Sequence, residues 1–97
     1  MTVQSDTLTK ILLKEPELFD VVILNDDKTP MEFVTGLLTE LFNKTQQDAI
    51  DLMLSIHNNG SAVAGTYIFE IAEQKSVDAT TLARDSGFPL SIKINAQ

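Results

Sequence analysis

The side chains best suited to chemistry in this sequence gather where an apolar run ends. Residues 21–24 are followed at once by Asn25, Asp26 and Asp27, which carry one amide and two carboxylates. We call residues 25–29 the elbow. The oxygens of these carboxylates and of the amide can accept hydrogen bonds. The only histidine, His57, offers one more acceptor, the unprotonated nitrogen of its imidazole. With apolar side chains beside it, this set of acceptors would suit a ligand that is partly cationic and partly apolar.

Each of these residues also has an ordinary structural interpretation. Asn-Asp-Asp is a common turn sequence, and His57 can cap the last turn of a helix, where a positive charge suits the helix dipole. Asp26, Asp27 and His57 could also bind a divalent metal, but three candidates without a ligand-spacing signature make a weak metal site. The sequence contains no Gly-rich phosphate loop, Gly-x-Ser-x-Gly turn or His-Glu-x-x-His motif. We therefore expect a binding protein without a metal or other cofactor, and not an enzyme.

The residues after the acidic pair predict the start of a helix. Thr29 can be its N-cap, Pro30 suits the first helical position, and Glu32 completes a Thr-x-x-Glu capping box. Apolar residues then recur with helical spacing, which predicts an amphipathic helix from about Met31 to Asn43. Its apolar first turn would lie beside the elbow.

A second helix is expected over residues 46–58, with Thr45 as its N-cap and Gly60 as a left-handed terminator. The link between the two helices is so short that they must form a hairpin. His57 comes four residues after Met53, so both side chains project from one helical face. If that face packs near the elbow, His57 approaches the acidic side chains.

The remaining pattern predicts strands over residues 21–24, 63–71 and 90–94, and a surface helix over residues 72–86. Because residues 21–24 are all apolar, we expect them to form a central strand. The resulting order, βααβαβ, predicts an α+β fold with a small three-stranded antiparallel sheet and helices packed on one face.

Composition limits the domain organisation and the possible partners. The 97 residues are enough for one domain, and we expect a flexible N-terminal arm over residues 1–17 and a core domain over residues 18–97. A net charge of −7 argues against nucleic acids and anionic membranes as partners. The absence of cysteine excludes disulfides. The longest apolar run near the N-terminus, Ile11–Leu13, is too short for a signal peptide or a membrane span, so we expect a cytoplasmic protein.

The elbow and the residues around it resemble the signature of the ClpS family, the bacterial adaptors that recognise N-degrons. The resemblance begins as V-I-L-N-D-D-x-T-P-M-E-F-V over residues 22–34. It continues as L-M-L-x-I-H over residues 52–57, Gly60, Gly65, E-x-A-E-x-K over residues 70–75, and Pro89-Leu90. It covers nearly all of the chain from Val21 to Ile94.

This resemblance implies an adaptor that delivers proteins to a Clp AAA+ unfoldase and its protease. Its substrates would begin with Leu, Phe, Tyr or Trp. The free α-amino group would be held by Asn25, Asp26, Asp27 and His57. The first side chain would enter a pocket formed by Leu24, Thr29, Met31, Val34, Met53, Ile56 and Leu90.

The resemblance also implies a second contact, with the N-terminal domain of a ClpA- or ClpC-type unfoldase, at Glu70 and Lys75. The N-terminal arm would be engaged by the unfoldase during delivery.

Some features depart from the family pattern. The arm is short, Lys28 stands where many members carry an aromatic residue, and Ile56 replaces the commoner valine, which adds one methylene to the pocket wall. The alternative interpretation is a docking module of the same fold that binds a partner protein through its helix surfaces.

Overall fold

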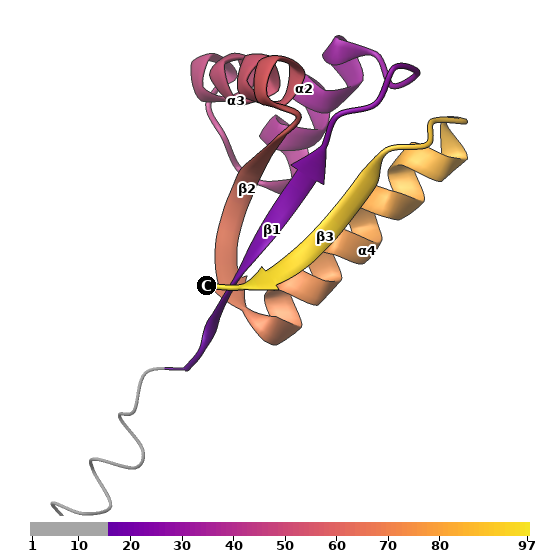
Figure 1. Ribbon diagram of the computed structural model, residues 1–97. Coiled ribbons are helices and arrows are strands. Elements are labelled where there is room, and N and C mark those ends of the chain that lie inside the picture. The colour runs from indigo at the N-terminus through magenta and orange to yellow at the C-terminus, as the bar shows by residue number, and fades with distance from the viewer. Residues whose placement is uncertain (1–15) are drawn as a thin grey trace, which may run out of the picture.

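A computed structural model of the chain describes residues 16–97, which form three strands and three helices (Figure 1). The order is β1 (Leu18–Leu24), α2 (Met31–Leu41), α3 (Gln46–Asn59), β2 (Ser61–Ile68), α4 (Phe69–Asp85) and β3 (Ser91–Ala96). This confirms the predicted βααβαβ order and the α+β class. The expected arm of residues 1–17 lies, as far as residue 15, outside the described residues.

The three strands form one antiparallel sheet in the order β2-β1-β3, as predicted. The central strand β1 is buried on both faces, since Val21 and Ile23 are fully inaccessible and Val22, which points to the opposite face, is only 7% exposed. Val21 pairs with Ile94 and Ile23 with Ile92 on the neighbouring strand β3. The apolar run of the sequence is therefore the strand that leads directly into the elbow.

The helices are divided between two parts of the sheet. Figure 1 shows α4 lying along the sheet, and α2 and α3 packed together at the end where β1 stops. α4 buries Ala72, Ala79 and Ala83, whose small side chains let the helix approach the strands closely. The core cluster consists of Val21, Ile23, Val34, Leu37, Leu38, Phe42, Ala49, Ile56, Ala64, Ala72, Ala79, Ala83 and Leu90. No helix among residues 16–97 has the length and apolar character needed to cross a membrane.

The boundary between β2 and α4 differs from the predicted one. The alternating pattern predicted a strand to residue 71 and a helix from residue 72, but β2 ends at Ile68 and α4 begins at Phe69. Ile68 pairs with Leu18, the first residue of β1, and within residues 16–97 the pairing of these two strands goes no further. Phe69 instead packs its ring edge-to-face on Phe19, with the centroids 5.2 Å apart.

Lys75 joins α4 to the end of α2. Its Nζ donates a hydrogen bond to the Leu41 carbonyl at 2.6 Å, in the last turn of α2. The same ammonium lies 5.4 Å from the centre of the Tyr67 ring and 5.9 Å from that of Phe42. Burial raises the pKa of Tyr67, which keeps this ring a neutral phenol. A Cβ at Gly65 would clash with the Tyr67 hydroxyl, so a side chain at position 65 would force the Tyr67 ring to shift.

Candidate functional site

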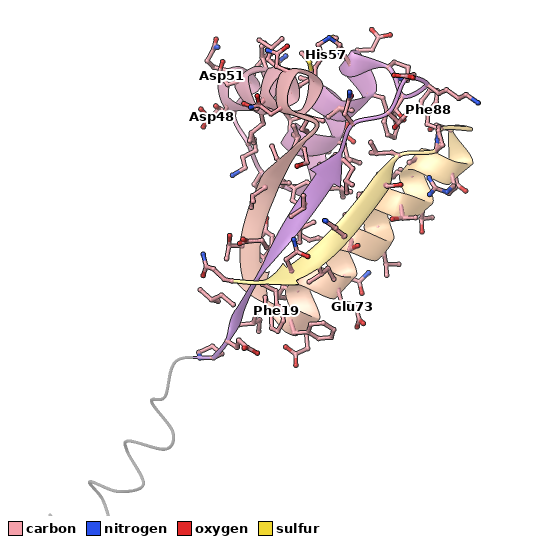
Figure 2. All side chains as sticks on the ribbon, in the orientation of Figure 1. Phe19, Asp48, Asp51, His57, Glu73 and Phe88 are labelled. Carbon is pink, nitrogen blue, oxygen red and sulfur yellow. The ribbon has the colours of Figure 1, made fainter. Side chains whose placement is uncertain are left out.

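A cavity of about 340 Å³ opens beside the end of β1. Its walls come from the elbow, the first turns of α2 and the C-terminal half of α3. The lining residues are Asn25, Asp26, Asp27, Thr29, Pro30, Met31, Val34, Met53, Ile56 and His57. In Figure 2, His57 is labelled at this end of the molecule, far from Phe19 and Glu73 at the other.

Asp26 fixes the shape of the elbow. Its Oδ1 accepts hydrogen bonds from the backbone N–H groups of Lys28 at 2.8 Å and Thr29 at 2.7 Å, and its Oδ2 accepts one from the Thr29 hydroxyl at 2.7 Å. Desolvation by itself raises the pKa of Asp26, but these three hydrogen bonds and the charge of Arg84 together outweigh it, so the pKa is lowered. The carboxylate is therefore ionised and already satisfied within the elbow.

The prediction that Thr29 would be the N-cap of α2 was wrong. The N-cap is Pro30, not Thr29, and no side chain caps the helix. The Thr29 hydroxyl instead donates to Asp26, and Pro30 lies one position before the first helical residue, Met31. Pro30 also lines the cavity, although the sequence pattern predicted for it only a place at the start of the helix.

The elbow is tied to the end of α3 by the main chain. The Asn25 N–H donates to the Gly60 carbonyl at 2.8 Å. Gly60 ends α3 with a left-handed φ of 92°, and its own N–H donates to the Ile56 carbonyl at 2.9 Å, which confirms the predicted terminator. At the other end of α3, the predicted cap is also present, because Thr45 accepts a hydrogen bond from the Asp48 N–H. The hydrogen bond between Asn25 and Gly60 explains how Asn25 and His57, distant in sequence, come to line one cavity.

The cavity has a polar mouth and an apolar floor. Val34 and Ile56 are 6% and 3% exposed and belong to the core. Met53 is half-buried, and Met31 is 43% exposed where α2 begins. Asn25, Asp27 and His57 are all exposed.

The two acidic residues of the elbow differ in their surroundings. Among the described residues, no hydrogen bond occupies the Asp27 carboxylate, whereas that of Asp26 accepts three. Asp27 can therefore contribute a carboxylate to a ligand at the mouth, together with the amide oxygen of Asn25 and an imidazole nitrogen of His57. Three acceptors of this kind match the three N–H bonds of a primary ammonium group.

Two residues assigned to the pocket do not line this cavity. Leu24 is half-buried at the end of β1. Leu90 is 1% exposed and part of the core. Arg84 holds the segment before β3 in place, because its Nη1 donates to the carbonyls of Phe88 and Leu90 at 2.9 Å each. The other residues predicted for the α-amino site and the pocket all line the cavity.

Glu70 and Lys75, the residues assigned to a partner contact, lie on α4 away from the cavity. Glu70 is exposed in the first turn of the helix, while Lys75 is half-buried and makes the internal contacts described above. Within residues 16–97, no three His, Cys, Asp or Glu side chains are grouped so that they could hold a metal ion.

Comparisons with known proteins identify relatives of this architecture. The profile of the family described as ATP-dependent Clp protease adaptor protein ClpS matches residues 14–93. The ATP-dependent Clp protease adapter protein ClpS of Treponema denticola is 41% identical over 91 residues, which are 94% of this chain and 90% of that protein. That of Paraburkholderia phymatum is 47% identical over 78 residues, 80% of this chain and 75% of the relative.

A solved structure shares the fold as well. Agrobacterium tumefaciens ClpS2, bound to L-phenylalaninamide, superposes with a TM-score of 0.82 at 38% sequence identity. The match covers 86% of this chain and all of that one.

Proposed function

This chain belongs to the ClpS family of ATP-dependent Clp protease adaptor proteins, and from that membership and its cavity we propose that it binds proteins by their first residue. The ligand is a free α-ammonium group followed by a bulky hydrophobic side chain: Leu, Phe, Tyr or Trp. The bound protein is then delivered to a Clp AAA+ unfoldase and its protease. By family the chain is an adaptor, not a catalyst.

The observation that supports this proposal is the pairing of a polar mouth with an apolar floor in one cavity. The ammonium group is held by Asn25, Asp27 and His57, which line the cavity and are exposed. The first side chain lies against Val34 and Ile56, with further contacts from Met31, Met53, Thr29 and Pro30. Asp26 supports the ammonium site by holding the elbow in shape.

The ligand of the related structure has the same chemical parts. L-Phenylalaninamide, bound to the ClpS2 of Agrobacterium tumefaciens, carries an α-amino group, a benzyl side chain and an amide, as does the first residue of a protein that begins with Phe. The similarity of fold and sequence to that protein supports a ligand of the same type for this cavity.

The expected affinity follows from the groups involved. Each hydrogen bond between the ammonium group and an acceptor contributes about 1.5–3 kcal/mol when charge-assisted. Burial of a Leu or Phe side chain adds about 1.5–3 kcal/mol. After the loss of translational and rotational freedom, binding in the micromolar range or somewhat tighter is expected. Such affinity allows the adaptor to release what it carries.

Delivery requires a second surface. The unfoldase contact is assigned to Glu70 and Lys75, near the start of α4 and at the opposite end of the sheet from the cavity (Figure 1). A bound protein and a ClpA- or ClpC-type N-terminal domain would therefore not compete for the same space. Because the Lys75 ammonium is engaged by Leu41, Tyr67 and Phe42, Glu70 is the more accessible member of the pair.

A peptide series tests the proposal. Twenty peptides that differ only in the first residue are titrated into the full chain, and fluorescence anisotropy gives each dissociation constant. Peptides beginning with Leu, Phe, Tyr or Trp should bind, while the same peptides with an acetylated N-terminus should not. Equal binding by free and acetylated forms would exclude recognition of the ammonium group and would indicate a docking module for hydrophobic segments.

A further inference from the structure

Both methionines within residues 16–97 line the same cavity. The sequence has no cysteine and three methionines, of which Met31 and Met53 are wall residues of the site. Met31 is 43% exposed at the beginning of α2, whereas Met53 is half-buried within α3. Thioethers are the only sulfur groups in the chain, and the more accessible of these two stands where a ligand side chain must pass.

We propose that Met31 is a site of reversible oxidation that switches off ligand binding, a form of regulation that rests on the proposed function. The oxidant is hydrogen peroxide. The thioether sulfur attacks one peroxide oxygen, so that an S–O bond forms as the O–O bond breaks. The proton of the transferred hydroxyl passes to the departing hydroxide, and the products are methionine sulfoxide and water. Sulfur loses two electrons, which peroxide gains.

The position of Met31 explains why this reaction would control binding. A sulfoxide oxygen is a strong hydrogen-bond acceptor, and in water it is well solvated. A hydrophobic side chain that enters the cavity removes this water, and the apolar residues Val34, Met53 and Ile56 in the cavity offer no side-chain donor in exchange. We expect the affinity for a peptide that begins with Phe to fall about tenfold, since the sulfoxide would lose its hydrating water against this apolar part of the cavity wall.

Exposure sets the order of reaction. Peroxide reaches Met31 from solvent, while Met53 is partly covered by the packing of α3 on the core. Met31 should therefore be oxidised first. A bound ligand should slow its oxidation by covering the same wall. Methionine sulfoxide reductases, which convert both sulfoxide epimers back to the thioether with electrons from a dithiol, should restore binding.

The experiment uses the full chain and a labelled peptide that begins with Phe. The protein is treated with hydrogen peroxide, catalase removes the excess, and anisotropy gives the dissociation constant before and after treatment. Peptide mapping by mass spectrometry locates each added oxygen. Met31→Leu and Met53→Leu are treated in parallel, and each variant is compared only with its own untreated form.

The proposal is supported if oxygen appears at Met31 before Met53 and if the affinity for the peptide falls about tenfold and recovers with the two reductases. Peroxide should also change the affinity of Met53→Leu but not that of Met31→Leu. Oxidation of Met31 without loss of affinity would overturn it, as would equal sensitivity of Met31→Leu. A fall in melting temperature that accompanies the loss of affinity would overturn it as well, because the effect would then be unfolding. If the untreated protein does not bind the peptide at all, the proposed function itself is wrong.

Discussion

At the scale of single residues, the two neighbouring aspartates of the elbow have different roles. Asp26 accepts three hydrogen bonds from within the elbow, while Asp27 is exposed at the cavity mouth. From the residues alone, His57 was expected to approach this acidic pair if the helix face that it shares with Met53 packs near the elbow, and the resemblance to the ClpS family implied one site for all three. The sequence could not distinguish the two carboxylates, since their difference depends on backbone directions within a turn.

Substitution of each aspartate should separate stability from binding. Asp26→Ala removes a side chain that satisfies two backbone N–H groups, and we expect the free energy of unfolding to fall by about 1 kcal/mol, as for the loss of a helix cap. Asp27→Ala should leave the melting temperature unchanged and weaken binding of a peptide that begins with Phe. Thermal denaturation and anisotropy, measured on both variants, check this division. Equal melting temperatures for Asp26→Ala and the parent chain would contradict the structural role.

The effect of Asp26→Ala should depend on pH. The folded-state pKa of Asp26 is lowered, so its ionised form stabilises the fold at pH values above the unfolded-state pKa of about 3.9. This stabilisation is lost as the pH falls through the folded-state pKa. The difference in melting temperature between the variant and the parent chain should therefore be constant near neutral pH and shrink below about pH 4.

His57 should make binding sensitive to acid in a different way. An imidazole nitrogen can accept a hydrogen bond from the ligand ammonium only while it is unprotonated, and protonation also places two positive charges together. Acidification should therefore weaken binding of a Phe-initiated peptide, and His57→Asn, which keeps an acceptor oxygen, should remove this dependence. Anisotropy titrations across pH give the result. A profile that is the same in both proteins would remove His57 from the ammonium site.

At the scale of helices and strands, the sequence predicted types and order better than boundaries. The spacing of apolar residues fixed α2 and α3, and Thr45 and Gly60 marked the ends of α3 as expected. The predicted start of α4 was wrong because residues 69–71 have strand-like side chains, whereas β2 pairs with β1 only as far as Ile68 in the described part of the chain. Boundaries set by a distant strand cannot be predicted from local pattern.

Lys75 gives a prediction at this scale, because it joins two helices. Lys75→Met keeps much of the aliphatic stem but loses the hydrogen bond to Leu41 and the interaction with the rings of Tyr67 and Phe42. We expect it to lower the free energy of unfolding by about 1–2 kcal/mol. Glu70→Gln, on the exposed first turn of the same helix, should have no such effect.

The same two variants inform the partner contact. If Glu70→Gln weakens association with the N-terminal domain of a Clp unfoldase without a change in melting temperature, Glu70 contacts that domain directly. A loss of association in Lys75→Met that follows its loss of stability would instead indicate a role in holding α4 in position. Urea denaturation and a pull-down with the isolated domain separate these results.

At the scale of the whole molecule, ligand binding should raise the stability of the fold, because a cavity lined by residues distant in the sequence exists only in the folded chain. Val34 and Ile56 line the cavity and also belong to the core cluster. A ligand at a hundredfold excess over its dissociation constant contributes about 2.7 kcal/mol. In a domain of this size each kcal/mol corresponds to roughly 4–8 °C in melting temperature. A rise in melting temperature of at least ~10 °C is therefore expected with a Phe-initiated peptide. The acetylated form of the same peptide should cause no rise.

The backbone hydrogen bond between Asn25 and Gly60 has a consequence for redesign. It joins the two halves of the binding cavity, so the width of the opening is set by the turn after α3 as well as by the lining side chains. Directed evolution toward a different first residue can therefore vary the residues that flank Gly60 as well as the side chains that line the cavity. Selectivity would then be adjustable at two places, the cavity wall and a turn whose residue Gly60 does not line the cavity.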